Sequence, residues 1–347
     1  MDNKSLNKEP LLEWANFIDE AHKDDEAYVN IKSNHLFTNE EYEELLCEKY
    51  GLDKDDWTIV SDFDLLENYI KKKFIVCNSC GVIRYYADYD EKEKKYPAAD
   101  AKGFTGVGPS EPNSKAKFAV FSLDIDVNGN GILFCLFEKN EDSKEKPWTF
   151  KQFISSSESG RWFNNLPKIK EDAKPTLKRL GSEFDVSKLQ SSKMTNLTFN
   201  IDHVKKEGHI ERFLPKEVID LFNIARRKSS KKDKQRIDAT INDLIEIFIY
   251  DNIKLLNMDE CLCGWAISDL EQKDYVPVNL FFPFRLKGRI YAAMVVRITA
   301  ENEQPVLATI FDLRMAYTGA KLYYAQKLSS GWLTIENVRK ELKKINS

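Results

Sequence analysis

The sequence predicts an α+β protein with a mainly antiparallel β core, packed helices and a helical, acidic N-terminal part. The 347 residues are 42% hydrophobic and 12% aromatic, which is enough for a sizeable core. Apolar residues recur at helical spacing near the N-terminus and again in the third quarter of the chain. Most of the rest consists of short runs of β-branched and aromatic residues separated by turn residues, which indicate antiparallel strands.

The N-terminal region, residues 1–73, is expected to be helical. Residues 11–18 and 39–46 place apolar side chains three and four apart, and Thr38 precedes acidic residues as an N-cap does. Residues 62–70 repeat the pattern and lead into three lysines that suit a helix C-terminus.

Charge is unevenly distributed along the chain. The net charge is −4, but residues 1–56 hold 16 acidic and 6 basic side chains. The remainder therefore carries a positive balance, which favours an anionic partner, although solvated helical faces explain such asymmetry equally well.

Residues 74–333 are expected to form one α+β core domain, followed by a C-terminal helix over residues 334–347. The polar stretch 90–117, rich in Gly and Pro, is expected to be an exposed, mobile loop. Helices are expected at 216–222 and 237–250. The expected strands are 74–77, 82–87, 117–123, 132–137, 148–153, 197–201, 278–284, 289–298 and 305–311.

The segment "DIDVNGNG" resembles the first half of a calcium loop. Asp124, Asp126, Asn128 and Gly129 match its early positions, but Cys135 stands where the closing Glu is required. Strand-like runs flank the segment, and Asn-Gly twice in succession suits a tight turn. A β-hairpin with solvated carboxylates at its tip is therefore expected, with no metal.

The six cysteines indicate a reducing compartment, because they are too few for a disulfide scaffold of this length. Cys77 and Cys80, together with Cys261 and Cys263, leave a zinc site open as an alternative to ordinary strand-end thiols. No cofactor is expected.

No leader or apolar stretch of membrane-spanning length is found in the sequence. A cytoplasmic protein without a membrane partner is expected.

A strongly basic run covers residues 225–236. It holds seven positive charges and one negative charge, and it includes the candidate nucleic-acid contacts Arg226, Arg227, Lys228, Lys231 and Lys232. Such a run binds phosphates in a salt-dependent way. The alternative is a solvated helix face or connector.

Two further segments supply candidate site residues. His203 and His209 lie near Arg212 and are suited to proton transfer at neutral pH, although a packed histidine is the alternative. Asp312, Arg314 and Tyr317 follow a strand and are expected to line a ligand pocket, or else to form an internal salt bridge from Asp312 to Arg314 or Lys321. The site list is therefore His203, His209, Arg212, Asp312, Arg314 and Tyr317.

The segment "TIFDLRMAYTGAKLYYAQKLSSGWL" resembles the closing motif of the bacterial domain of unknown function 3825 family. "VNLFFPF", "NIDHV", "HIERFLP", "GILFCLFEKN", "WTFKQF" and "LLENYIKKKF" extend the resemblance over residues 40–333. Arg314, the Thr318-Gly319 pair and the insert 90–117 depart from the family pattern. Members are often joined to cold-shock or OST-HTH modules, which implies work linked to RNA.

These observations lead to one functional hypothesis and its alternatives. The chain is expected to bind RNA or a nucleotide-like ligand in RNA metabolism, stress or defence, with the basic run attracting the polyanion. The alternatives are a non-catalytic interaction module, a homodimer or a partner of an operon protein, and a metal-dependent enzyme. Whether the chain is an enzyme stays open, because no standard catalytic motif is found.

Overall fold

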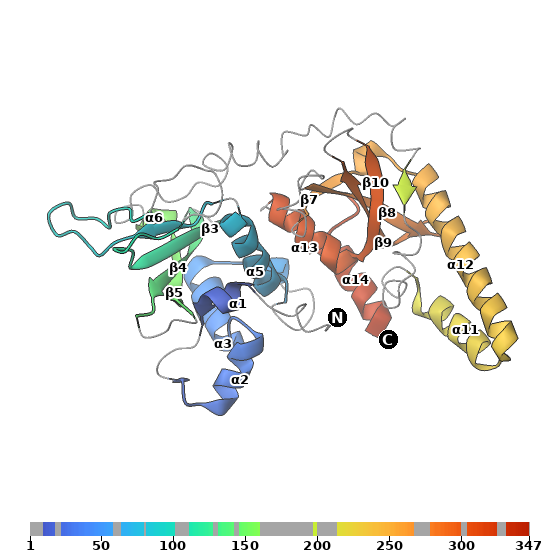
Figure 1. Ribbon diagram of the computed structural model, residues 1–347, viewed down its shortest axis with the longest axis horizontal. Helices are drawn as coiled ribbons and strands as arrows, with labels where there is room; N and C mark the ends of the chain where they lie inside the picture. The colour runs from blue at the N-terminus through green and yellow to red at the C-terminus, as the bar shows by residue number, and fades with distance from the viewer. Residues whose placement is uncertain are drawn as a thin grey trace. The chain divides into compact units, whose positions relative to one another are not determined.

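The computed structural model divides the chain into two compact units, Met1–Leu180 and Gly181–Ser347, each described here by itself (Figure 1). The expected boundary at residue 73 falls inside a helix, and both units contain a sheet. The structure describes residues 10–17, 22–57, 64–79, 81–100, 111–127, 131–141, 146–159, 197–199, 214–266, 278–299, 304–324 and 331–346.

The first half of unit 1 is helical, as the apolar spacing predicts. Thr38 is the expected N-cap: its hydroxyl accepts from the Glu41 amide at 3.3 Å, and the Glu41 carboxylate accepts from the Thr38 amide at 2.7 Å. The first helix is shorter than expected, since residues 15–16 turn into a strand. The helices are α1 (Pro10–Trp14), α2 (Glu26–Asn34), α3 (Asn39–Tyr42), a π-helical segment (Glu43–Glu48), α4 (Lys54–Trp57) and α5 (Asp64–Ser79).

The sheet of unit 1 has the strand order β1-β5-β4-β3-β2. Only the β1–β5 pair is parallel, and the others are antiparallel. The strands are β1 (Ala15–Asn16), β2 (Arg84–Tyr86), β3 (Phe118–Asp126), β4 (Ile132–Lys139) and β5 (Trp148–Ser155), and the short helix α6 (Ser156–Ser159) follows β5. The expected hairpin of "DIDVNGNG" is confirmed: β3 and β4 pair, and the Val127 amide donates to the Gly131 carbonyl at 3.0 Å.

Helix α5 corrects the prediction of a strand at residues 74–77. The β-branched run favours a strand locally, but Tyr69, Phe74 and Cys77 recur at helical spacing with Leu66 and all are buried. Burial of this stripe outweighs the local preference, so the three lysines lie inside the helix rather than at its C-terminus.

The loop expected over 90–117 is in part structured. In its described residues, bridges join Tyr86 to Ala98 and Asp100 to Pro112. The Asp100 carboxylate lies 3.7 Å from the guanidinium of Arg84 in β2. Burial raises the pKa of Asp100 by more than Arg84 lowers it. The described part is therefore a ribbon that extends the β2 edge, not an exposed loop throughout.

The sheet of unit 2 has the order β6-β10-β9-β8-β7, antiparallel except for β6 beside β10. The expected strands and both helices of this region are confirmed in the described residues, and the helices are longer than predicted. The elements are β6 (Thr198–Phe199), α11 (Lys216–Arg227), α12 (Lys231–Lys254), β7 (Leu262–Trp265), β8 (Val278–Leu286), β9 (Arg289–Ile298), β10 (Pro305–Asp312), α13 (Leu313–Tyr324) and α14 (Ile335–Asn346).

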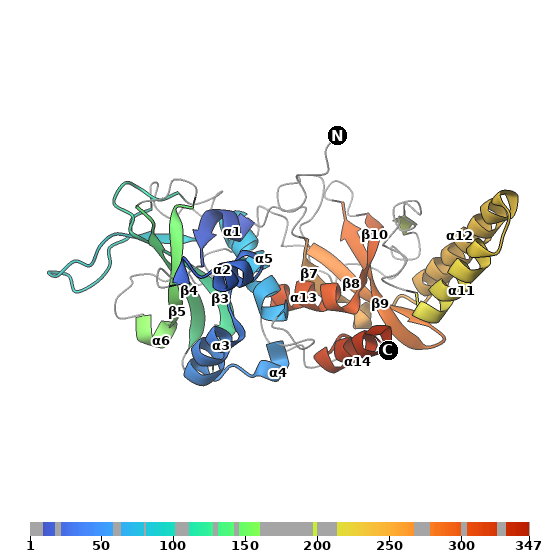
Figure 2. The ribbon, with the colours of Figure 1, turned by 90° about the horizontal axis from the view of Figure 1, so that it is seen from below.

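Helices cover both faces of this sheet (Figure 2). Ile245 and Ile249 of α12 join Phe282 in one core cluster. Phe281, which points to the other face of β8, packs where β7 and α13 approach closely. A Cβ added at Gly319 would lie 3.0 Å from its ring, and one added at Gly264 would lie 3.0 Å from the Gly319 carbonyl carbon. The small residues near Gly319 therefore serve packing.

The fold is α+β, as the sequence predicts, with predominantly antiparallel pairing in both sheets. None of the helices in the described part of the chain is both long and apolar enough to cross a membrane.

Candidate nucleic-acid interface

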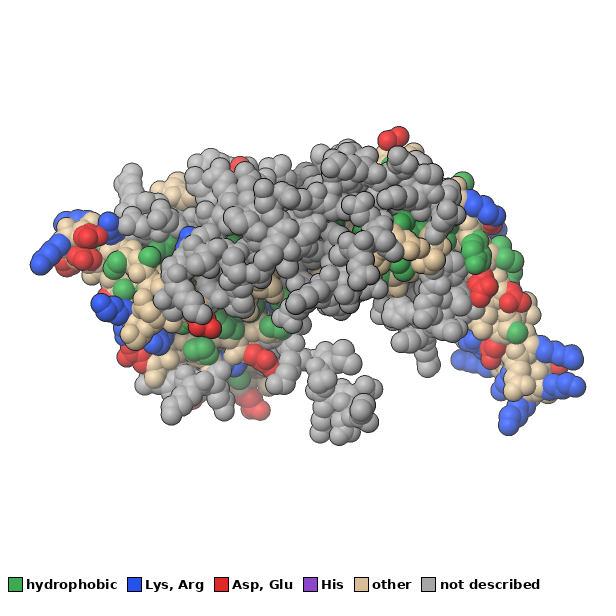
Figure 3. Space-filling view, turned by 45° about the horizontal axis from the view of Figure 1, so that its top comes forward, with side chains coloured by type: hydrophobic (Ala, Val, Ile, Leu, Met, Phe, Trp, Pro, Cys, Tyr) green, Lys and Arg blue, Asp and Glu red, His purple; other side chains and the backbone are tan. Residues whose placement is uncertain are grey.

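A basic tip joins helices α11 and α12 of unit 2. We define it as Arg226, Arg227, Lys228, Lys231 and Lys232, which end the first helix, form its cap and begin the second. Arg226 is half-buried and the other four are exposed. The two helices form an antiparallel hairpin, and Figure 3 shows Lys and Arg side chains gathered at its end.

Two serines close the turn between the helices. The Ser229 hydroxyl donates to the Ala225 carbonyl at 2.7 Å, and the Ser230 hydroxyl accepts from the Asp233 amide at 3.3 Å. Ser230 is thereby the N-cap of α12. The first bond closes the last turn of α11 and the second caps α12, so the five cations are displayed on a formed turn.

The run of cations extends into α12, where it opposes the helix dipole. Lys231, Lys232, Lys234 and Arg236 occupy the N-terminal turns, where negative charge is favoured, and Asp233 offsets one of them. Arg226 and Arg227 at the end of α11 are, by contrast, favourably placed. The start of α12 therefore combines a positive helix end with uncompensated cations, which is an arrangement suited to an anion.

Within the described part of the chain, the only ion pair of the basic tip joins Arg226 and Asp238. The Nε–Oδ1 distance is 2.6 Å, but both side chains are nearly half exposed, at 43% and 49%. Exposed pairs of this kind contribute about 0–1 kcal/mol. The pair links the two helices without neutralising the tip.

The structure places Asp312, Arg314 and Tyr317, the residues of the expected pocket, where β10 ends and α13 begins. Asp312 ends β10, and its carboxylate accepts a hydrogen bond from the Met315 amide at 2.7 Å, so it caps α13. Arg314 is exposed, whereas Tyr317 and Lys321 are buried. The expected ligand pocket and its alternative, a salt bridge from Asp312, stay predictions.

His203, His209 and Arg212 lie outside the described residues, so their expected role stays a prediction.

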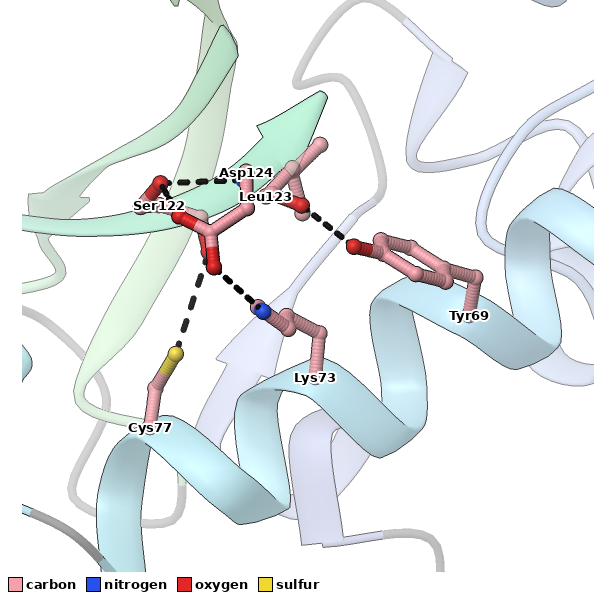
Figure 4. Close-up of polar contacts among 6 residues, drawn as sticks. All are labelled: Tyr69, Lys73, Cys77, Ser122, Leu123 and Asp124. Carbon is pink, nitrogen blue, oxygen red and sulfur yellow. Dashed lines mark hydrogen bonds and ion pairs between the residues drawn. The ribbon is translucent and has the colours of Figure 1, made fainter. Parts of the chain in front are cut away.

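A buried polar cluster that the sequence did not reveal links α5 to β3 in unit 1 (Figure 4). The Lys73 ammonium lies 2.7 Å from the Asp124 carboxylate, and their side chains are only 3% and 16% exposed. The Ser122 hydroxyl donates to the same carboxylate at 2.8 Å. The Tyr69 hydroxyl donates to the Leu123 carbonyl, and the Cys77 thiol lies 3.8 Å from the Ser122 carbonyl.

This cluster corrects the expectation that Asp124 is a solvated carboxylate at a hairpin tip. Asp124 has φ +55° at an irregularity in the β3–β4 register, which turns its side chain toward α5. Burial by itself lowers the pKa of Lys73. The interactions with Tyr69 and Asp124 together raise it by more, so the pKa of Lys73 lies above its ordinary value. The 69, 73, 77 spacing is the signal that a helical interpretation of this segment would have used.

The described thiols are buried or partly buried, and no metal centre is found among them. Burial raises the pKa of Cys261 and of Cys135, which favours the protonated thiol over the thiolate that a metal requires. Among the described residues, no three of His, Cys, Asp and Glu gather as metal ligands do. Cys77 belongs to unit 1, Cys261 and Cys263 belong to unit 2, and Cys80 lies outside the described residues.

The fold and the site therefore define an α+β chain of two units, with a cationic helical hairpin on the second. Comparison of the chain with protein-family models, with curated proteins and with solved structures found no match.

Proposed function

We propose that this chain binds RNA and that the basic tip of the α11–α12 hairpin contacts the phosphate backbone. The observation that supports this most is the display of exposed cations on a formed turn at the start of a 24-residue helix. Those cations cost helix stability where they stand, and a bound phosphate would relieve that cost. The family resemblance of the closing segment favours RNA over other polyanions.

The contact expected from this arrangement is sequence-independent. Lysine and arginine side chains on a turn reach phosphates, whereas reading bases requires stacking aromatic side chains or hydrogen bonds to base edges. Tyr250, an exposed aromatic side chain of α12, lies about five helical turns from Lys231, roughly 30 Å at the helical rise. We therefore expect affinity that depends on salt more than on base identity.

The test is binding of a labelled single-stranded RNA to the full chain over a range of salt concentrations. The variant changes Arg227, Lys228, Lys231 and Lys232 to Gln. If each contacts one phosphate, the slope of log affinity against log salt falls by about 3. A control variant changes Lys92, Lys94, Lys115 and Lys139, exposed lysines of unit 1, to Gln and alters the net charge equally.

The two variants separate a local interface from general charge attraction. Loss of binding in the tip variant alone supports the proposal. Equal weakening in both variants, or wild-type binding that does not change with salt, would contradict it.

A second candidate function is a protein interaction module, and a specific observation favours it. The same hairpin carries large hydrophobic side chains in contact with solvent, among them Leu221 and Ile247. Monomeric proteins seldom expose such side chains together.

A further inference from the structure

Four exposed leucine and isoleucine side chains lie on the α11–α12 hairpin. Leu221 and Ile224 of α11 are 64% and 48% exposed, and Leu244 and Ile247 of α12 are 37% and 52% exposed. Each pair has the three-residue spacing of one helix face. We call these four residues the outer patch; Figure 3 shows hydrophobic side chains along this hairpin beside its cationic end.

The outer patch is distinct from the faces that these helices pack on the core. In α12 the core residues are Ile241, Ile245 and Ile249, and Ile247 lies across the helix from them. Helix α11, described along its whole length, has no fully buried residue, and its inward side chains include Val218 and Phe222. Both helices are therefore apolar on two sides, although a solvated hairpin requires only one.

Side chains of opposite charge flank the patch at its two ends. Along the outer face of α11, Glu217 comes first, then Leu221 and Ile224, then Lys228. Leu221 and Ile224 are equally far from a point between residues 222 and 223. Glu217 and Lys228 are also equally far from that point, and they carry opposite charges. On α12, Lys232 lies on the tip side of the patch and Asp251 on the base side.

We propose that a second copy of this chain covers the outer patch, with each α11 lying antiparallel to the α11 of the other subunit. A two-fold axis between residues 222 and 223 places Leu221 against Ile224 of the partner subunit. The same axis brings Glu217 to the partner's Lys228. A two-fold interface has to be complementary to itself, and this pattern satisfies that condition.

The antiparallel orientation also keeps the two basic tips apart. A parallel arrangement of the two hairpins would instead place the basic tips side by side, and their like charges would repel.

The mass of the full chain, freed of nucleic acid, is the first test. Light scattering after gel filtration should give twice the single-chain mass of 40.3 kDa at micromolar concentrations. The paired substitutions Leu221→Ser and Ile224→Ser remove only exposed apolar surface, so the fold should persist while the dimer dissociates. A wild-type monomer at every concentration, or a dimer that survives these substitutions, overturns the proposal.

A charge exchange tests the antiparallel orientation. Glu217→Lys alone and Lys228→Glu alone each place like charges together twice per dimer, and we expect a weakening of roughly tenfold or more in the dissociation constant. The two substitutions combined restore opposite charges, and the dimer should recover. A combined variant as weak as the single ones excludes this pairing.

Dimerisation and RNA binding are separable by these experiments. The masses are measured without RNA, so they do not depend on the proposed function. Both proposals use Lys228, and RNA should therefore compete with the second subunit for this lysine. A dimer that binds no RNA would leave the present inference intact and remove the proposed function alone.

Discussion

Two ion pairs of nearly equal length stand in opposite surroundings. Lys73 and Asp124 of unit 1 are 2.7 Å apart and nearly sealed from solvent, whereas Arg226 and Asp238 of unit 2 are 2.6 Å apart and open to it. Solvent screens the second pair and leaves it little energy, while the first has to be satisfied completely or it destabilises the fold. Distance alone therefore says little about what an ion pair does.

The buried pair is satisfied by neighbours that the exposed pair lacks. The Asp124 carboxylate accepts from Ser122 as well as from Lys73, and the Ser122 hydroxyl in turn accepts from the Asp124 amide at 3.0 Å. Asp124 also adopts a left-handed backbone conformation, which costs about 1 kcal/mol for a residue other than Gly. The conformation is retained because it turns the carboxylate toward α5.

The largest effect is expected from Asp124→Asn. Asparagine tolerates the left-handed conformation, so the change mainly leaves the Lys73 ammonium buried without a counter-charge, and we expect a loss of about 3 kcal/mol in the free energy of unfolding of unit 1. Hydrogen exchange of the α5 and β3 amides under increasing denaturant measures it. Adding Lys73→Met removes both charges and should restore most of the loss; no recovery would contradict a charge effect.

A somewhat smaller effect is expected from Gly264→Ala in unit 2, where packing rather than charge is tested. The added methyl group would collide with the Phe281 ring and meet the Gly319 backbone at 3.0 Å. Overpacking of this kind costs about 2 kcal/mol, measurable by urea denaturation. The second change Phe281→Leu makes room and should recover part of the stability. Unchanged stability in the Gly264→Ala variant would show that the contact between β7 and α13 has room for a methyl group.

Alkaline pH should weaken unit 1 through the same cluster. Burial raises the pKa of Tyr69, and the pKa of Lys73 is raised net above its ordinary value of 10.5. Both groups keep their proton to a higher pH in the folded chain than in the unfolded chain. Their contribution to the free energy of unfolding is therefore complete below the unfolded pKa, and it is lost as the pH rises toward the folded pKa.

We expect each of these groups to remove up to about 1.4 kcal/mol of stability per pH unit above about pH 10. Denaturation monitored by circular dichroism between about pH 9 and pH 11 measures this decline. The Tyr69→Phe variant should lose less stability as the pH rises. If its stability declines as steeply as that of the wild type, Tyr69 does not cause the decline.

The smallest effect is expected from Asp238→Asn, the counterpart of the first variant in the exposed pair. It should change the free energy of unfolding of unit 2 by about 0.5 kcal/mol or less, and added salt should abolish the difference. Because Asp238 offsets one charge of the basic tip, RNA binding should tighten slightly. A loss of stability as large as that of Asp124→Asn would remove the contrast between the two pairs.

Sequence patterns predicted the elements whose local and tertiary preferences agree. The β3–β4 hairpin follows from its Asn-Gly turn, and α12 follows from the isoleucines that face the core. Helix α5 was missed where the preferences conflict, because the β-branched residues after Lys73 favour a strand. Helix α13 was also missed, since Thr318 and Gly319 are weak helix formers; the close contact with the Phe281 ring leaves little room for a side chain at position 319.

The candidate site was predictable only in part. The basic run was evident from composition, but its display on a capped turn between two helices depends on Ser229 and Ser230. Asp312 was predicted as a pocket or salt-bridge residue because its sequence neighbours are charged, whereas a carboxylate at a strand–helix junction also suits an N-cap. Burial of Lys73 could not be inferred while its segment was interpreted as a helix terminus.

In the described residues, both sheets have their shortest strands at the edges. β1 and β2 have two and three residues, and β6 and β7 have two and four, whereas the inner strands have eight to ten. A long hydrophobic strand with an open edge can recruit the same strand from another chain, which begins aggregation. Because short strands flank β3, β5, β8 and β10, the long inner strands are kept from such templating even while the helical hairpin stays free to meet a partner.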